Sequence, residues 1–352
     1  MHRRDAIAAL ATLGGALVAL IALPGCGGKP SAPMTPSVPP PAPLHLDPAT
    51  DLAAAAGLVW LVDVRPRDVF AALDLIPALS LVLPEKRLDA FAKKNGGVDL
   101  RKLSQLVVAT YKEASLYVAR GAFDPARLEK AFEERTEQLD GRALDKATAP
   151  SGAAAAPITR LWGTARGQRE QIAIFGREAF ALERGRFGPL RATEAFAQGK
   201  LKRAKPALRD VPLARAAELV GDAPFRAFAP GPFEGEWAAG LGGLLKASTA
   251  AAVAARPRSD AGATKGRVDV TLVLTGAWGD DADAASARLA AAYGRLADDP
   301  LGKLCGLNRP IEAPRTRGSS DALTLDVGLD GFEIARGLRA ATEATVEEVM
   351  SY

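Results

Sequence analysis

The feature that most constrains the fold is an order that recurs along the chain: two extended segments followed by an amphipathic helical segment. Residues 104–111 and 114–121 read as the strands of a hairpin on either side of a two-residue turn. The same order returns in 171–197, 246–299 and 311–350, with glycines near the strand ends at unequal intervals. Unequal intervals argue against a solenoid, whose repeats keep a nearly constant length. We predict an α+β fold with antiparallel sheets covered by helices on one face, built from repeated strand–strand–helix units in two related halves.

The clearest strand lies in residues 266–278, where side chains alternate with the two-residue period of a half-buried sheet. Four apolar residues are expected on one face (Val268, Val270, Leu272 and Leu274), and a more polar set on the other (Asp269, Thr271, Val273 and Thr275). Val273 makes the second face imperfectly polar, which indicates partial cover there. Two helix starts are also recognisable, because Asp124 precedes Pro125 and Asp330 has capping-box spacing to Glu333.

The N-terminus carries a different signal. Arg3 and Arg4 precede an uncharged run of small and apolar residues from Ala6 to Leu23, and the run ends in Leu23-Pro24-Gly25-Cys26. This layout is that of a secretory signal peptide. Over residues 1–26 the segment resembles the lipobox signal of bacterial lipoproteins, with Pro24 as a departure from the usual small residues. A plain cleaved signal and a retained membrane span are the alternatives.

The resemblance implies cleavage before Cys26 and attachment of acyl chains, palmitate among them, to its sulfur and to the new N-terminus. More than one chain is needed for stable membrane attachment, since each buried methylene contributes about 0.8 kcal/mol. Gly27 after the cysteine implies the outer membrane with the body facing the periplasm; the inner membrane and the cell surface are alternatives. The general secretory route and the twin-arginine route, which Arg3-Arg4 would suit, both stay open.

The expected organisation follows from these segments. Residues 1–25 are the signal peptide, and 26–48 are the lipidated cysteine and a proline-rich disordered tether. The body divides into a first α+β half at 49–215 and a second at 216–352, or forms one continuous domain. It resembles no family securely, and is only weakly similar to uncharacterised exported bacterial proteins.

Histidine and cysteine usage narrows the chemistry. The two histidines are His2 and His45, so the body from residue 49 onward contains none. This excludes Ser-His-Asp and Cys-His catalysis, histidine-ligated zinc and a histidine proton shuttle in the body. Cys305 is the only cysteine besides Cys26. We expect it to be a small buried hydrophobic residue, with a reactive thiol as the alternative.

One basic segment is the candidate binding site. Between residues 184 and 209 a single acid, Glu194, opposes eight basic residues: Arg184, Arg186, Arg191, Lys200, Lys202, Arg203, Lys205 and Arg209. Such a run is commonly a solvated face. The functional interpretation is contact with anionic lipid, lipopolysaccharide, an acidic wall polymer or an envelope protein. The export signal argues against nucleic acid.

Other constellations are weaker. Asp280, Asp281 and Asp283 are better explained by helix initiation than by calcium binding, and Glu234 beside Glu236 is an acid pair with no spacing specific to glycosidases. Four tryptophans are expected in the core or at strand ends (Trp60, Trp162, Trp237 and Trp278). No nucleotide-binding or serine-nucleophile motif occurs. We therefore expect no cofactor, no metal and no catalytic residues.

The sequence thus predicts a lipid-anchored lipoprotein of the cell envelope that is a non-catalytic binding or structural module. Two alternatives stay open: a carrier that holds an acyl chain or another apolar ligand between sheet and helices, and a hydrolase that uses carboxylates only. A cavity lined by leucine, phenylalanine and valine would favour the carrier.

Overall fold

The computed structural model describes residues 43–136, 147–148, 158–186, 188–200, 204–258 and 266–343. They belong to one compact unit, Pro40–Tyr352. The predicted signal peptide, Cys26 and most of the predicted tether lie outside the described residues, as do Lys202 and Arg203 of the basic segment. Within the described ranges no helix combines the length and the apolar character that crossing a bilayer requires.

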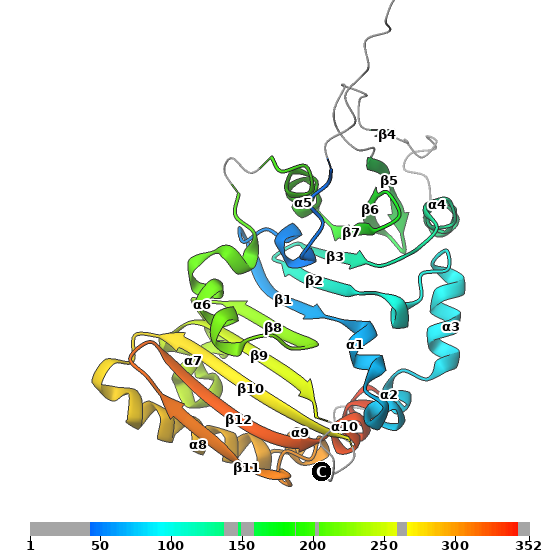
Figure 1. The fold of residues 1–352 in the computed structure, drawn as a ribbon. Helices are drawn as coiled ribbons and strands as arrows, with labels where there is room; N and C mark the ends of the chain where they lie inside the picture. Colours follow the sequence, from blue (N-terminus) through cyan, green and yellow to red (C-terminus); the bar gives the residue numbers. More distant parts are fainter. Residues whose placement is uncertain are drawn as a thin grey trace, which may run out of the picture. The chain divides into compact units, whose positions relative to one another are not determined.

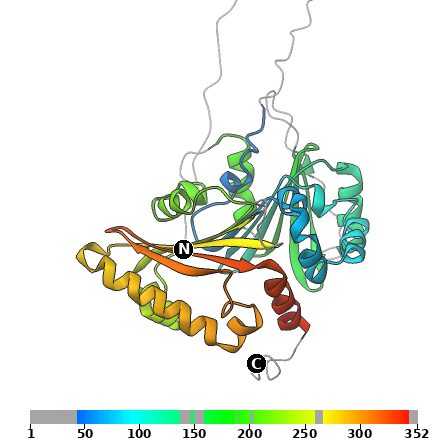
Figure 2. The same cartoon turned by 60° about the horizontal axis from the view of Figure 1, so that its bottom comes forward.

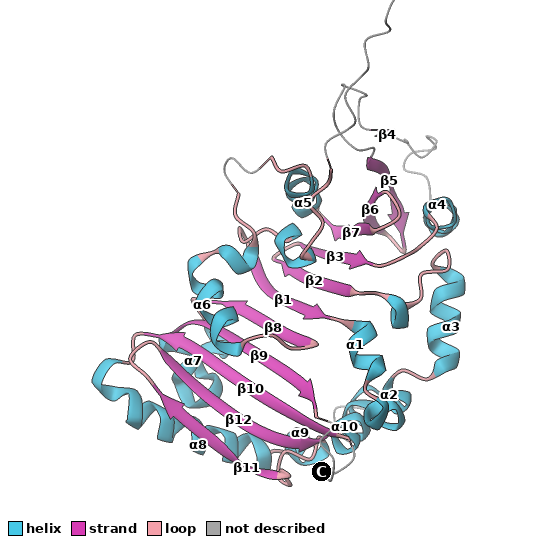
Figure 3. Cartoon of the chain, viewed as in Figure 1, coloured by secondary structure: helices cyan, strands magenta, loops and turns pink. Residues whose placement is uncertain are grey.

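The fold is a mixed α+β fold built on one large antiparallel sheet (Figures 1 and 3). In the described parts of the chain the sheet has twelve strands in the order β11-β12-β10-β9-β8-β1-β2-β3-β7-β6-β5-β4. The strands are β1 (Leu58–Val64), β2 (Gln105–Tyr111), β3 (Ala114–Arg120), β4 (Ala147–Thr148), β5 (Ile158–Ala165), β6 (Gln168–Phe175), β7 (Ala179–Gly185), β8 (Phe225–Pro230), β9 (Ser248–Pro257), β10 (Arg267–Gly276), β11 (Glu312–Gly318) and β12 (Ala322–Asp330).

Counting β1 and β8 themselves, five strands on each side of the sheet's centre follow the same order, and β5 and β4 continue the first series without a counterpart. Outward from β1 it runs β1-β2-β3-β7-β6, and outward from β8 it runs β8-β9-β10-β12-β11. Each series contains two hairpins. The second strand of the later hairpin pairs with the second strand of the earlier one, as β7 does with β3 and β12 with β10. The two series meet where β1 pairs with β8. The halves that the sequence predicts, 49–215 and 216–352, therefore share one continuous sheet.

Helices fill the connections between strands. They are α1 (Pro66–Ala71), α2 (Ile76–Val82), α3 (Glu85–Lys94), α4 (Pro125–Arg135), α5 (Pro189–Ala197), α6 (Val211–Val220), α7 (Leu244–Ala247), α8 (Ala282–Asp298), α9 (Pro300–Leu304) and α10 (Gly331–Glu343). Short 3-10 turns include η1 (Ala49–Leu52), η3 (Leu100–Lys102), η5 (Ala207–Arg209), η6 (Gly235–Gly243) and η7 (Gly279–Asp281). The hairpins β2–β3, β6–β7, β9–β10 and β11–β12 are each followed by a helix.

Both helix starts recognised in the sequence are capped by an aspartate side chain. Asp124 accepts a hydrogen bond from the backbone N–H of Ala126 at 3.0 Å, and Pro125 occupies the first position of α4. Asp330 caps α10 in the same way, through the N–H of Phe332 at 2.8 Å. In a capping box the Glu333 side chain would also reach back to the backbone N–H of Asp330. Here the Glu333 carboxylate instead pairs with Arg336, one turn further along α10.

One face of the sheet, which we call the α6 face, carries the largest core. Side chains from β5 across to β10 contribute to it, among them Ile158, Val107, Phe228 and Val273. Helices α5 and α6 cover it with Leu190, Phe196, Leu213, Ala216 and Val220, and η1 adds Ala49 and Leu52. The burial of Val273 on this face matches the partial cover that the sequence indicates.

The opposite face, which we call the α8 face, carries two separate cores. One lies against α4, where Leu128 and Phe132 meet strand residues such as Ile172 and Ile174. The other lies under α8, where Leu289 meets Leu274 and a row of β12 residues, Leu323, Leu325, Val327 and Leu329. Figure 2 shows α8 below the sheet, with α5 and α6 above it.

Helices therefore lie on both faces, and the expectation that they lie on one face is corrected. The reason is visible in β6, where Ile172 and Ile174 are buried on the α8 face while Ala173 and Phe175 are buried on the α6 face. A strand with buried apolar side chains at both odd and even positions needs covering elements on both faces of the sheet.

The last residues of the predicted tether are ordered against the body. Leu46 is buried in the α6-face core, and Leu44 packs against it. The backbone N–H of His45 donates a hydrogen bond to the carbonyl of Ala197 at the end of α5, at 2.7 Å. The packed region thus begins by Leu44 and not at residue 49, because two leucines in the proline-rich segment have apolar surface to bury.

Candidate functional site

An apolar pocket of about 270 Å³ lies on the α8 face between the first-half strands and helices α3 and α4. Its wall is formed mostly by aliphatic and aromatic side chains: Phe91, Val98, Leu100, Leu103, Leu106, Val108, Tyr117, Ala119, Leu128, Ile172, Phe180 and Leu182, with Asn95, Arg135 and Arg184 at one side. This is the composition typical of small-molecule sites, which are mainly hydrophobic with a few polar groups that set orientation.

The pocket exists because the segment between β1 and β2 inserts α3 beside α4. Gly96, just after α3, has a φ of +66°, and a Cβ at this position would lie 2.5 Å from the carbonyl oxygen of Arg127 in α4. Glycine is required both by the left-handed conformation and by this close approach. Contact at the end of α3 therefore fixes its separation from α4 and leaves space over the strands below.

A buried arginine–glutamate–arginine cluster borders the pocket. Glu170 of β6, whose side chain is 5% exposed, lies 3.1 Å from Nη2 of Arg135 and 2.7 Å from Nε of Arg184. Arg135 also donates through Nη1 to Oδ1 of Asn95 at 2.9 Å. With two guanidinium groups and one carboxylate, the cluster has one positive charge in excess.

The hydrogen-bonding capacity of this cluster is not filled by the described residues. Nε of Arg135, Nε of Arg184 and Oε2 of Glu170 are buried and lack a correctly aligned partner among them. Burial lowers the pKa of Arg135 from its ordinary value, against the opposing effect of Glu170. The guanidinium is therefore held away from solvent, where an anion is attracted more strongly than at an exposed site.

A charged hollow of about 680 Å³ adjoins the pocket and shares Phe91, Asn95, Arg135 and Arg184 with it. Lys93, Lys94 and Arg166 add further positive charge, against Glu134 and Glu170. The apolar pocket thus has a predominantly basic mouth.

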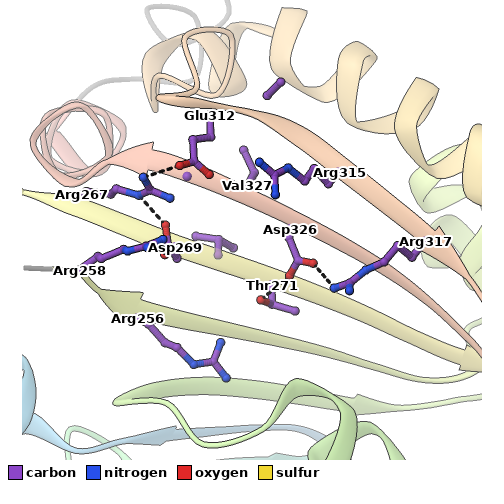
Figure 4. A pocket seen from close by; sticks show the side chains of 13 residues that line it. Arg256, Arg258, Arg267, Asp269, Thr271, Glu312, Arg315, Arg317, Asp326 and Val327 are labelled. Carbon is purple, nitrogen blue, oxygen red and sulfur yellow. Dashed lines mark hydrogen bonds and ion pairs between the residues drawn. The ribbon is translucent and has the colours of Figure 1, made fainter. Parts of the chain in front are cut away.

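A second hollow, of about 600 Å³, lies on the α6 face of the second half (Figure 4). We call it the arginine face. It comprises five arginines and three acids on β11, β12, β10 and the end of β9: Arg256, Arg258, Arg267, Arg315, Arg317, Asp269, Glu312 and Asp326. Cross-strand pairing places Thr271 opposite Asp326 and Asp326 opposite Arg315, so these side chains share one face of the sheet.

Most charges of the arginine face are paired. Arg267 donates from Nε to Asp269 and from Nη1 to Glu312, both at 2.7 Å. Arg317 lies 2.6 Å from Asp326, which also accepts from Thr271. The hydrogen bond from Arg267 holds the pKa of Glu312 below its ordinary value. Above that pKa Glu312 is a carboxylate, and lowering the pH through it removes the pairing.

Two arginines of this face have no carboxylate partner in the described chain. Arg256 donates to the backbone carbonyls of Val220 and Asp222 only. Arg315 makes no hydrogen bond or ion pair with the described residues, although its charge lowers the pKa of Glu312 after that of Arg267. Five guanidinium groups against three carboxylates leave a net charge of +2, and these two residues account for it.

The predicted basic segment is not gathered into one site. Arg184 borders the apolar pocket, while Arg186, Lys205 and Arg209 pair with Glu113, Asp210 and Asp51. Arg191 on α5 and Lys200 are exposed, and Lys202 and Arg203 lie outside the described residues. Glu194, the one acid noted within the run, pairs with Arg160 of β5. Acids outside the run thus neutralise much of its charge, some of them distant in sequence and one, Asp210, directly after it.

The remaining candidates lie elsewhere. Cys305 is half-buried at the end of α9, and burial raises the pKa of its thiol, which favours the unreactive protonated form. Asp280 and Asp281 form η7, with Asp283 in the first turn of α8, and no group of three possible metal ligands occurs within the described ranges. Glu234 and Glu236 are exposed.

The tryptophans depart in part from the expectation of core or strand-end positions. Trp278 is buried, and Trp162 is half-buried in β5. Trp60 is 39% exposed and Trp237 is 72% exposed. Trp237 lies in η6 next to a glycine-rich stretch that offers few side chains to cover it.

Comparison with protein-family models, with curated proteins and with solved structures finds no match for this chain. The pocket and the arginine face therefore stand on their geometry alone. Neither was singled out from the sequence, because their residues are spread over positions 91–184 and 256–328. The charged residues at alternate positions of β11, Arg315 and Arg317, are the one local signal that could have pointed towards the second.

Proposed function

We propose that this chain is a lipid-anchored, non-catalytic binding protein of the bacterial cell envelope, and that its body holds an acyl chain bearing an anionic head group. The lipobox-like segment ending in Cys26 supports the anchor, and the outer membrane with a periplasm-facing body is the location it favours. The observation that carries the binding function is the apolar pocket with its basic mouth.

The pocket suits the hydrocarbon part of such a ligand. Leucine, valine and phenylalanine side chains form most of its wall, so an apolar chain that leaves water for this space gains about 25 cal/mol for each Å² buried. A polar ligand would lose hydrogen bonds to water without replacing them there.

The mouth suits the head group. Among the described residues, Arg135 and Arg184 have Glu170 as their only carboxylate partner, and both keep a buried Nε without an aligned acceptor. A carboxylate or phosphate group at this position would accept charge-assisted hydrogen bonds from the guanidinium groups, which present their donors in a planar fork.

We also propose that the two halves of the body are related units, each built from strand–strand–helix segments. The matching strand orders on the two sides of the β1–β8 pair support this relation, as does the position of α4 and α8, which follow the first hairpin of each half and both lie on the α8 face.

The binding proposal is tested by filling the pocket. In the full chain carrying Cys26→Ser, which removes the acyl chains of the anchor itself, we expect cis-parinaric acid to bind with a rise in fluorescence. Val108→Trp places an indole in the pocket and should weaken binding at least tenfold. Thr110→Trp is the matched control, because Thr110 lies one pleat further along the same face of β2 and outside the pocket wall.

The methyl ester of the same probe tests the mouth, since it keeps the chain and removes the charge. We expect it to bind more weakly than the acid, and to be excluded equally by Val108→Trp. Equal affinities of the two tryptophan variants for the acid would refute the pocket as the binding site. Native mass spectrometry of the wild-type protein from its own host would then identify the bound ligand by mass.

A further inference from the structure

The arginine face is a second site, separate from the proposed acyl pocket. It lies in the other half of the sheet and on the opposite face, so no residue is shared between the two. From the charges and hydrogen-bonding groups it presents, we infer that the arginine face binds an acidic polysaccharide, a linear polymer that carries both carboxylates and hydroxyls.

Its dimensions indicate an extended ligand. The site crosses from β9 to β11, which is three strand spacings or roughly 14 Å, and Arg315 and Arg317 are two residues apart on β11, roughly 7 Å. A single small anion would occupy a minor part of a hollow of about 600 Å³. A polymer with charges at regular intervals can meet several guanidinium groups in succession.

The position of the charges disfavours a membrane surface as the ligand. Arg267 lies within the hollow with its side chain 11% exposed, and the floor is lowered at Gly328, where a Cβ would lie 3.2 Å from Nε of Arg267. A flat array of lipid head groups could reach the exposed Arg315 and Arg317 of β11 but not Arg267 at the floor, whereas a polymer chain lying in the hollow could contact all three.

The three carboxylates decide between polymer classes. Asp269, Glu312 and Asp326 alternate with the arginines and would repel a polymer made only of phosphates. The same carboxylates and the hydroxyl oxygen of Thr271 can accept hydrogen bonds from sugar hydroxyls. The two arginines without carboxylate partners, Arg256 and Arg315, supply the uncompensated charge that an acidic sugar would neutralise.

The experiment measures binding of polygalacturonate oligomers to the full chain carrying Cys26→Ser, by isothermal titration calorimetry in about 0.15 M salt, where long-range attraction between exposed charges is screened. We expect the unsubstituted face to bind, and Arg315→Gln to weaken binding at least fivefold. Arg315 makes no ion pair with the described residues, so this substitution should leave the urea unfolding midpoint unchanged.

The control is Arg288→Gln. Arg288 is exposed on α8, on the opposite face of the sheet, and its replacement changes the net charge by the same amount. We expect its affinity to stay within twofold of the unsubstituted chain, and neutral dextran not to bind. The inference is overturned if polygalacturonate does not bind, if both variants weaken it equally, or if polyphosphate binds more tightly than the polysaccharide.

Discussion

The two halves of the sheet share the order of five strands but differ in where they leave open space. In the first half the α6 face is filled by η1 and α5, and the pocket lies on the α8 face. In the second half α8 covers the α8 face and buries Leu274, Leu289 and Leu323. The arginine face lies on the opposite, α6 face. The positions of the covering helices, more than the strand order, therefore determine where a ligand can enter.

The difference has a local cause on each face. Helix α8 is 17 residues long and alanine-rich, so it packs close over β11 and β12, whereas α4 has 11 residues and shares its place with the inserted α3. On the α6 face, α6 packs against β9 and β10 and does not extend over β11. The side chains of β11 and β12 on the α6 face are consequently exposed to solvent, and many of them are charged.

The largest expected effect tests whether the halves are joined as one unit. At the β1–β8 junction the Asp63 side chain is 3% exposed and accepts from Nε of Arg226 at 3.1 Å and from Nε2 of Gln105 at 2.8 Å. Asp63→Ala leaves a buried guanidinium unpaired and should lower the free energy of unfolding by about 3–5 kcal/mol. Urea denaturation should still show a single transition.

The control for that substitution is Asp222→Ala. Asp222 pairs with Arg65 at 2.9 Å but its side chain is 74% exposed, so we expect a loss of less than about 1 kcal/mol. Two separate transitions in the Asp63 variant, or equal losses in both variants, would show that the junction does not couple the halves.

The next effect compares the closed and the open side of the α8 face. Leu289 on α8 and Leu128 on α4 are both buried, but Leu128 also lines the apolar pocket, whereas Leu289 belongs to the core under α8. We expect Leu289→Ala to cost about 4 kcal/mol and Leu128→Ala about 2 kcal/mol, because a residue beside a cavity loses fewer contacts. Chemical denaturation measures both, and a larger loss for Leu128 would contradict the comparison.

The smallest effect concerns the loop under the pocket. The side-chain hydrogen bond from Arg101 lowers the pKa of Asp99, and Arg101 also reaches Asp89 of α3 at 2.7 Å. A lowered pKa in the folded state contributes stability above the unfolded value near 4, and this is lost as the pH falls through the folded value.

Asp99→Asn keeps a side-chain oxygen as the cap of η3 and removes the charge. We expect the wild type to lose more stability than this variant between pH 5 and pH 3, by less than about 1 kcal/mol. Urea midpoints at the two pH values measure the difference. If the stability of both proteins falls equally between the two pH values, the ion pair between Asp99 and Arg101 does not contribute to stability.

Much of the strand pattern could be predicted from local sequence. The hairpins at 104–121 and 171–185 were recognisable because alternating side chains and turn residues report on neighbouring positions. The side of the sheet on which each helix packs was not, since Ile172 to Phe175 are apolar at every position and are compatible with cover on either face.

The sites were harder to predict, for a reason that particular pairs make clear. Arg226 and Asp63 are 163 residues apart, and Arg209 and Asp51 are 158 apart, so a count of charges along the chain cannot tell which are neutralised. The apolar pocket is equally non-local, because residues of the inserted α3 segment meet those of β7 only in the folded sheet.

The burial of Leu46 and Ala49 beside α5 has a practical consequence for anyone shortening this protein. A shortened chain that begins at residue 49, where the proline-rich composition ends, would lack Leu46, which is buried in the core. It would also lack the hydrogen bond from the backbone N–H of His45 to the carbonyl of Ala197. Leucine removal from an interior costs about 2–5 kcal/mol, a large part of the stability of an ordinary domain. A shortened chain should therefore begin no later than Pro43, because residues 44–49 supply part of the hydrophobic core.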